Sequence, residues 1–283
     1  MKSLPLKGLH ISTRYHSSPF SLFDGVIRHR GLLVELVRRD FVGRYKGSFM
    51  GIAWSFFKPL IMLGIYTLVF SVALKAKWGM GGNGKATFAI VLFSGLIVHN
   101  FFSECITRAP LLIIENPNYV KKVVFPLEIL PWMALISALL HSLLSFVVLL
   151  IFCFVASVPL YGGVFLVPLL LLPLFFMTIG LSWIFASLGV YLRDLSQVMG
   201  TVSSITLFMS PIFYPVGNLP ELFRKIIFWN PISLPVIQIR EVMLLNRPIQ
   251  WEYWGIAMFV GLFASGFGYW WFQKTRRGFS DVL

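Results

Sequence analysis

Apolar runs of about 20 residues recur along this chain, and they constrain its fold more than any other feature. A helix of that length crosses the hydrocarbon layer of a membrane, which is roughly 30 Å thick. Charged residues make up 12% of the 283 residues, whereas about 25% is usual in soluble domains. The mean hydropathy of +0.80 agrees with this contrast. We therefore expect an all-α, polytopic membrane protein.

Six of these runs predict membrane-spanning helices, and the basic residues around them predict the orientation. Lys and Arg collect in the cytoplasmic segments of membrane proteins. If both termini lie in the cytoplasm, the cytoplasmic segments hold sixteen Lys and Arg and the outer segments hold seven, which favours this orientation. The net charge of +13 then reflects the membrane rather than nucleic acid. The expected spans are approximately 49–74, 86–106, 131–157, 164–191, 196–216 and 253–272.

The polar segments around the spans divide the chain into regions. Residues 1–48 form the expected cytoplasmic N-terminal region, 49–272 the six-span transmembrane domain and 273–283 a cytoplasmic tail. Two larger polar segments interrupt the transmembrane domain, a cytoplasmic one at 108–130 and an external one at 217–251.

Residues 28–46 predict an amphipathic helix that lies along the inner membrane surface. Basic residues interrupt one side of it, and such helices lie in the headgroup plane rather than spanning the bilayer. An ordinary cytosolic helix packed on a loop is the alternative. The apolar residues recur at steps of three and four: Leu32, Leu33, Leu36, Val37, Phe41 and Tyr45.

The external segment 217–251 predicts two short amphipathic helices. One helical stripe of apolar residues begins after Pro220, which suits a first helical turn, and a second begins near Val236. Asn230 and Pro231 separate the two stripes. We expect re-entrant helices that lean back onto the membrane before the last span.

The segment GMGGNGKAT, 79–87, imitates a phosphate-binding loop but lacks its chemistry. Ala86 stands where the Ser or Thr that binds Mg²⁺ should be, and the segment joins two predicted spans on the outer side. A flexible connector is the better interpretation. The chain also offers no catalytic triad, paired carboxylates or metal-ligand spacing, so we expect neither an enzyme nor a bound cofactor.

Few ionisable residues fall inside the spans, and such residues are functional candidates by default. Glu104 and Arg108 lie four residues apart near the inner end of the second span, so they are placed to pair on one helix face. Structural pairing is favoured over catalysis. His99 and His141 have no neighbouring carboxylate or cysteine in the sequence, and we expect core or interface positions for both.

Four motifs together resemble one family. GRYKGSFMGIAWSFFKPLI (43–61) and ENPNYVKKVVFPLEILP (115–131) are the more specific, and YLRDLSQ (191–197) and NPISLPVIQIREVML (230–244) follow in the matching places. The chain resembles, over about 28–272, the permease subunits of type-2 ABC exporters for bacterial polysaccharides, closest to the branch for O-antigen and lipid-linked polysaccharide.

The resemblance implies a homodimer of this permease with two copies of a separate cytosolic ATPase, which binds the ATP and Mg²⁺. The complex would export an undecaprenyl-pyrophosphate-linked polysaccharide across the bacterial inner membrane. Export of wall teichoic acid, of capsule, or of a small hydrophobic substrate such as a drug or haem is the alternative. The resemblance also implies that 115–131 docks the ATPase, with a simple basic loop as the alternative. The docking candidates are Glu115, Asn116, Asn118, Tyr119, Lys121 and Lys122.

A basic edge lies where the chain enters the membrane. Arg44, Lys46 and Lys58 are candidates for binding the pyrophosphate of the substrate, because Arg and Lys both bind phosphates by charge-assisted hydrogen bonds. Anchoring to anionic lipid is the alternative. Lys58 precedes Pro59, so we expect a short helix over 49–57 and a membrane span that starts after this pair.

Overall fold

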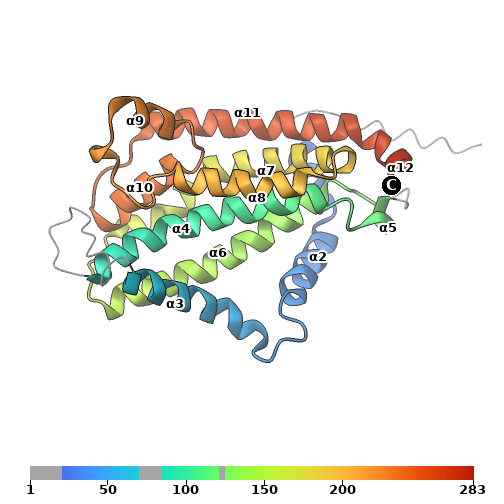
Figure 1. The fold of residues 1–283 in the computed structure, drawn as a ribbon. Coiled ribbons are helices and arrows are strands. Elements are labelled where there is room, and N and C mark those ends of the chain that lie inside the picture. The colour runs from blue at the N-terminus through green and yellow to red at the C-terminus, as the bar shows by residue number, and fades with distance from the viewer. Residues whose placement is uncertain (1–20, 70–84, 121–124) are drawn as a thin grey trace, which may run out of the picture.

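The computed structural model describes residues 21–69, 85–120 and 125–283, which form helices and connecting turns (Figure 1). The α-helices are α1 (Ser21–Arg28), α2 (Arg30–Gly43), α3 (Trp54–Tyr66), α4 (Lys85–Arg108), α5 (Pro117–Val120), α6 (Ile129–Val155), α7 (Val167–Tyr191), α8 (Leu195–Phe208), α9 (Glu221–Phe228), α10 (Ser233–Leu244), α11 (Trp251–Thr275) and α12 (Phe279–Val282). Short 3-10 turns lie at η1 (Gly51–Ala53), η3 (Ala109–Leu111), η4 (Gly162–Leu166), η5 (Val216–Asn218) and η6 (Arg276–Gly278).

Four helical stretches in the described residues are long and apolar enough to cross a membrane. They run over Ala86–Leu111, Ile129–Val155, Gly162–Tyr191 and Trp251–Val282. The corresponding helices α4, α6, α7 and α11 begin and end within a few residues of four predicted spans, which confirms those helices. They lie side by side and run in the long direction of the molecule (Figure 1).

The two remaining predicted spans correspond to shorter apolar helices, so the count of six spans stays a prediction. The helical stretch over Trp54–Val69 is one of them, and residues 70–74 of that predicted span lie outside the described residues. The other, α8, ends at Phe208 instead of near residue 216. Pro211 lies shortly after this end, and a proline disfavours helical backbone at the residue before it, here Ser210.

The predicted break at Lys58 and Pro59 is wrong, because α3 begins at Trp54 and continues through Pro59. A proline removes one main-chain hydrogen bond, and membrane helices tolerate this where neighbouring turns and helices hold the chain. Lys58 therefore lies in the second turn of α3, with its side chain exposed.

Close packing of α7 on α11 forms the most extensive helix contact of the bundle. A Cβ on Gly180 would lie 2.3 Å from the carbonyl oxygen of Ala264, and one on Gly268 would lie 2.2 Å from the carbonyl oxygen of Gly180. Both glycines are therefore needed for this approach. Small residues at contact points are a usual way for membrane helices to pack.

The helix predicted over 28–46 is present as α2, which is shorter than expected, and a further helix, α1, precedes it. α1 and α2 are separated at His29, and α2 ends at Gly43 rather than at residue 46. Gly43 is a poor helix former, and Gly47 takes a positive φ of 85° in the turn beyond it. The apolar side of α2 packs on α6, with Leu36 and Val37 buried. α2 runs across the direction of the long helices (Figure 1).

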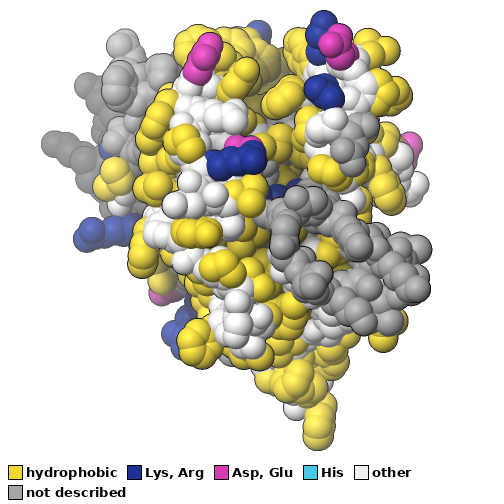
Figure 2. Space-filling model, turned by 90° about the vertical axis from the view of Figure 1, so that its left-hand side faces the viewer, with side chains coloured by type: hydrophobic (Ala, Val, Ile, Leu, Met, Phe, Trp, Pro, Cys, Tyr) yellow, Lys and Arg dark blue, Asp and Glu magenta, His cyan; other side chains and the backbone are white. Residues whose placement is uncertain are grey.

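The segment 217–251 contains two short helices as expected, α9 and α10, and they differ in exposure. α9 exposes Leu222 and Phe223, whereas α10 is buried around most of its circumference, with Met243 fully enclosed. That these helices are re-entrant and lean onto the membrane stays a prediction. The end of the molecule that carries α9 and α10 shows scattered charged side chains among hydrophobic ones, without one continuous basic patch (Figure 2).

The C-terminal tail packs back onto the opposite end. Phe279 of α12 is fully buried, and the hydroxyl of Tyr191 at the end of α7 donates a 3.0 Å hydrogen bond to the carbonyl of Thr275. α12 and α5 consequently lie at the same end of the bundle (Figure 1).

Candidate functional site

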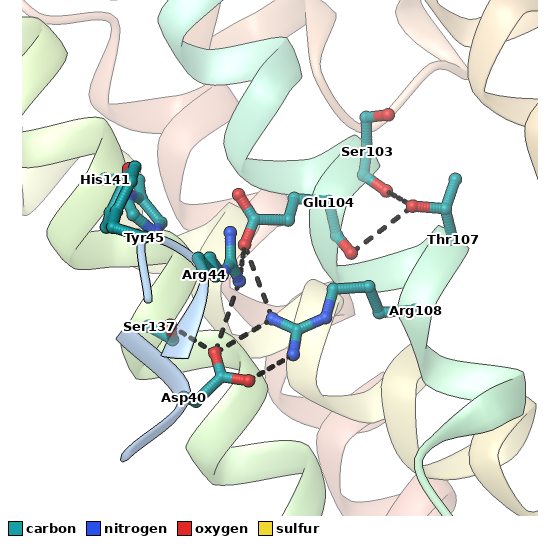
Figure 3. A network of polar contacts seen from close by, with 9 residues as sticks. All are labelled: Asp40, Arg44, Tyr45, Ser103, Glu104, Thr107, Arg108, Ser137 and His141. Atoms are coloured by element: carbon teal, nitrogen blue, oxygen red, sulfur yellow. Dashed lines mark hydrogen bonds and ion pairs between the residues drawn. The ribbon is translucent and has the colours of Figure 1, made fainter. Parts of the chain in front are cut away.

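A network of charged side chains joins α2, α4 and α6 (Figure 3). Asp40 of α2 accepts hydrogen bonds of 2.5 and 3.1 Å from the guanidinium of Arg108 and one of 2.6 Å from the hydroxyl of Ser137 on α6. Arg44, in the turn after α2, lies 3.3 Å from Asp40 and also pairs with Glu104. Glu104 lies 3.6 Å from Arg108 on the same face of α4. These five residues are the charged network.

The charged network is electrically balanced and partly shielded from solvent. Its four charged side chains are between 14% and 31% exposed. Burial alone would raise the pKa of the Asp40 carboxyl, but hydrogen bonds from Arg108 and Ser137 and the charges of both arginines outweigh burial and lower it. Burial would likewise lower the pKa of Arg44, but Glu104 and Asp40 outweigh it and raise that pKa. Both groups are therefore charged at neutral pH.

The sequence predicted one pair of this network and missed the rest. Glu104 and Arg108 pair as expected from their spacing. Asp40 and Ser137 were missed, because the contacts that bring them to α4 and to each other join residues far apart in the chain. One signal was available: Asp40 is the single acid among the basic residues of 38–46. Over 21–69, 85–120 and 125–283, no group of three or more His, Cys, Asp or Glu residues is placed to hold a metal ion.

An aromatic contact beside the charged network holds the turn after α2 to α6. The ring of His141 stacks on Phe41 with 4.6 Å between centroids, and its Nδ1 is 3.3 Å from the hydroxyl of Tyr45. His141 is thus an interface residue, as the sequence indicated. His99 lies at another interface, where its Nε2 is 3.1 Å from the main-chain carbonyl of Ser203 on α8.

One face of α4 continues from the charged network towards the middle of the bundle as a row of polar residues. Its neighbours on the other faces, such as Phe101, Cys105 and Ile106, are buried. The spacing of three and four residues places the row on one helix face. It consists of Asn100, Ser103, Glu104, Thr107 and Arg108, of which Asn100 is exposed and the others are partly exposed.

α8 packs against α4 and carries a similar row. The hydroxyls of Ser103 and Ser203 are 2.5 Å apart, which joins the two helices directly. On α8 the side chains of Gln197, Thr201 and Ser204 are exposed, again at helical spacing. We call the two rows together the polar stripe. Such residues are costly against lipid tails, so the stripe marks a surface that faces water, a polar ligand or another protein surface.

The docking candidates that the structure describes lie at the end of the bundle that carries α12. Glu115 and Asn118 are exposed, and the Asn116 amide donates a 2.9 Å hydrogen bond to a main-chain carbonyl one turn earlier. Lys121 and Lys122 lie outside the described residues. The segment 117–120 is a short helix, α5, so the polar residues before and within it are held in a defined conformation.

Ring stacking and ion pairs tie this segment to the rest of the molecule. Tyr119 stacks on Phe125 with 4.1 Å between ring centroids, and the guanidinium of Arg39 on α2 lies 5.9 Å above the Tyr119 ring. Arg276, just after α11, donates hydrogen bonds of 2.6 Å to Glu128 and 2.9 Å to the Phe125 carbonyl. The segment is therefore connected to both α2 and the last helix.

The three pyrophosphate candidates occupy different environments. Arg44 directs its guanidinium at Asp40 and Glu104 within the charged network. Lys46 is exposed in the turn after α2, and Lys58 is exposed on α3. The two lysines are therefore open to solvent or lipid, whereas Arg44 would have to leave a carboxylate to bind a phosphate.

Comparison with known proteins identifies the family. Residues 31–244 match the family model described as "ABC-2 type transporter". The chain is 28% identical over 253 residues to an "O-antigen export system permease protein RfbA" of Klebsiella pneumoniae, covering 89% of this chain and 95% of that protein. A protein of the same name from Myxococcus xanthus is 27% identical over 194 residues, covering 69% of this chain and 72% of that protein. The chain therefore belongs to the ABC-2 type transporter family.

Proposed function

We propose that this chain is the membrane-spanning permease subunit of an ATP-driven exporter that moves an undecaprenyl-pyrophosphate-linked, O-antigen-like polysaccharide across the bacterial inner membrane. One observation carries the proposal: the similarity to an O-antigen export permease of Klebsiella pneumoniae extends over 95% of that protein. The working unit would be a homodimer with two copies of a cytosolic ATPase, with both permease termini in the cytoplasm.

The polar stripe supports a glycan as the transported group. Sugars present hydroxyls that donate and accept hydrogen bonds, and Asn100, Thr201 and Gln197 offer the matching groups on exposed helix faces. A path for a drug or haem would be expected to be mainly apolar. The stripe ends at the charged network at one end of the bundle, so a glycan following it would pass from that end along α4 and α8.

The segment 115–131 would contact the ATPase, and the basic edge would contact the pyrophosphate of the substrate. We propose that Glu115 and Asn118 face the ATPase, since both are exposed at the end of the bundle opposite α9 and α10. We also propose that Lys46 and Lys58 contact the pyrophosphate, because their ammonium groups are exposed. Arg44 would contribute mainly by holding this region in place through Asp40 and Glu104.

Reconstitution tests the proposal. The permease is purified with its ATPase, placed in vesicles containing undecaprenyl-pyrophosphate-linked O-antigen, and supplied with ATP. A glycosidase that cannot cross the membrane then reports which glycans have reached the far side. We expect ATP-dependent exposure of the glycan, lost when the ATPase is inactivated. Transport of haem or a drug in the same vesicles without movement of the glycan would contradict the proposal.

Variants of the polar stripe sharpen this test. Asn100→Leu and Thr201→Leu make α4 and α8 more apolar and should favour insertion in the membrane, yet both should lower glycan transport severalfold. Val198→Leu is the matched control, because Val198 is exposed on α8 but apolar. Unchanged transport in both stripe variants would remove the stripe from the path.

A further inference from the structure

Arg240 of α10 is a buried arginine that the proposed transport path does not use. Only 5% of its surface is exposed. Its Nε donates a 2.9 Å hydrogen bond to the Val91 carbonyl on α4, and its two terminal nitrogens donate to the carbonyls of Pro211, at 2.5 Å, and Ile212, at 3.1 Å. One side chain therefore joins three separate elements: α10, α4 and the turn after α8.

The turn after α8 explains why a guanidinium is needed at this point. Buried main-chain carbonyls outside a regular helix have no helical partner and must find other donors. This turn directs two such oxygens, those of Pro211 and Ile212, to the same side chain. Arginine presents its donors in a rigid planar fork, so it can satisfy several oxygens at once, whereas lysine offers a single ammonium group.

A glycine on α4 makes the space for this guanidinium. A Cβ added at Gly95 would lie 2.5 Å from a terminal nitrogen of Arg240, 3.1 Å from Ile212 and 3.2 Å from Val236. In an ordinary helix, alanine is a better residue than glycine. Glycine at this position is therefore explained by the close approach of Arg240 and not by the helix itself.

We propose that Arg240 is a positioning residue that fixes the separation of α4 and α8 at the end of the molecule that carries α9 and α10. These are the two helices that carry the polar stripe, and at this end Arg240 bonds to α4 and to the turn that follows α8. The inference rests on the proposed function, since it assigns Arg240 the task of setting the width of the glycan path where it leaves the membrane. Sequence counting had placed Arg240 among the outer charges, whereas it is enclosed within the protein.

Two variants and one control test the proposal in the complete permease–ATPase complex. Arg240→Lys keeps the charge but loses the fork, and Gly95→Ala keeps the arginine but occupies its space. Arg247→Gln removes an exposed arginine from the same region, where it is 3.5 Å from Glu241. We expect the two test variants to assemble and hydrolyse ATP within twofold of the original protein, but to export at least fivefold less glycan per ATP. The control should behave as the original.

A second measurement does not depend on the substrate. Both native cysteines are first changed to alanine. The substitution Ser210→Cys then places a single thiol at a fully buried position in the turn after α8. Labelling by a thiol reagent should become at least tenfold faster when Arg240→Lys or Gly95→Ala is added, and stay unchanged with Arg247→Gln. If the original complex moves no glycan, the proposed function fails, and the labelling alone decides whether Arg240 positions α8.

Three results would overturn the inference. Equal labelling in all variants would show that Arg240 does not hold the turn. Faster labelling with a normal ratio of glycan to ATP would show a structural role without control of transport. The third result concerns the double variant. If Gly95→Ala lowers glycan export in an Arg240→Ala background as much as it does in the original protein, the added methyl group does not act by displacing the guanidinium.

Discussion

Replacing Asp40 by asparagine removes one of the two negative charges of the charged network while keeping the size of the side chain. Asp40 accepts hydrogen bonds from Arg108, Arg44 and Ser137. In the Asp40→Asn variant, two guanidinium groups share a single carboxylate, that of Glu104. The side-chain amide also presents donors towards groups that are themselves donors, so some of these bonds are lost without replacement.

The expected loss of stability in Asp40→Asn depends on how far the charged network is shielded from solvent. Breaking a fully buried ion pair costs about 3–5 kcal/mol, and an exposed pair contributes about 0.2–1 kcal/mol. The Asp40 side chain is 14% exposed and that of Arg108 is 31% exposed, so this network lies between the two cases. We expect Asp40→Asn to lower the free energy of unfolding by about 2 kcal/mol, which is about a 30-fold change in the folding equilibrium.

The native cysteines provide the assay. Cys105 and Cys153 are both buried, so a fluorogenic thiol reagent labels them only when the bundle opens. The purified permease is titrated with sodium dodecyl sulfate, and the labelled fraction gives the unfolding transition. Ser137→Ala, which removes one neutral donor, should cost about 1 kcal/mol, and Arg247→Gln should cost less than about 0.5 kcal/mol. A transition for Asp40→Asn that coincides with that for Arg247→Gln would refute the reasoning.

The pH dependence checks the same argument with the opposite perturbation. The pKa of Asp40 is lowered from its ordinary 3.8 in the folded protein, so its stabilising contribution is fully present above that value and is lost as pH falls through the lower folded value. The difference in stability between the original protein and Asp40→Asn should therefore be constant from neutral pH down to about pH 5 and shrink only below about pH 4. A difference that already shrinks between pH 7 and pH 5 would contradict a lowered pKa.

Four further changes test the topology, the docking segment, the helix packing and the basic edge. Arg247→Cys in a background without other cysteines should react with an impermeant thiol reagent added from outside, and no reaction would contradict the orientation. Asn118→Cys should cross-link to the ATPase. Reaction of this cysteine with an impermeant thiol reagent added from outside would instead contradict the docking role. Gly268→Ala should destabilise the bundle by at least 2 kcal/mol, roughly the cost of overpacking, because α7 and α11 must separate. Lys46→Gln and Lys58→Gln should each lower substrate-stimulated ATP hydrolysis while membrane insertion stays normal, and weaker membrane binding with unchanged ATP hydrolysis would favour lipid anchoring.

The length of the apolar runs predicted the long helices, because crossing a membrane requires only a continuous apolar run of about 20 residues. α4, α6, α7 and α11 agree with the predicted spans for that reason. Local spacing also predicted the pair Glu104 and Arg108, since residues four apart share a helix face. The path of α3 through Pro59 was not predictable from a local rule, because the tolerance of a proline depends on what packs around the helix.

The remaining site residues depend on contacts between distant parts of the chain. Asp40 meets Ser137 only because α2 crosses α6, and nothing in the neighbourhood of either residue specifies that crossing. Arg240 is buried because its acceptors include the carbonyls of Pro211 and Ile212 in the turn after α8, which only the folded chain brings to α10. Counting charges along the sequence treats Arg240 as a surface residue and therefore cannot find this arrangement.

The two ends of α4 contact arginine side chains in different ways, and this difference bears on where movement is expected. In the charged network, Arg44 and Arg108 share Asp40 and Glu104, so each guanidinium can exchange one carboxylate for the other with little change in charge balance. Around Arg240 the acceptors are main-chain carbonyls fixed in α4 and in the turn after α8, and no such exchange is open to them. If the segment 115–131 docks an ATPase as proposed, motion driven from it would be absorbed at this end by exchanging ion-pair partners. At the other end, α4, α8 and α10 must move together or lose buried hydrogen bonds.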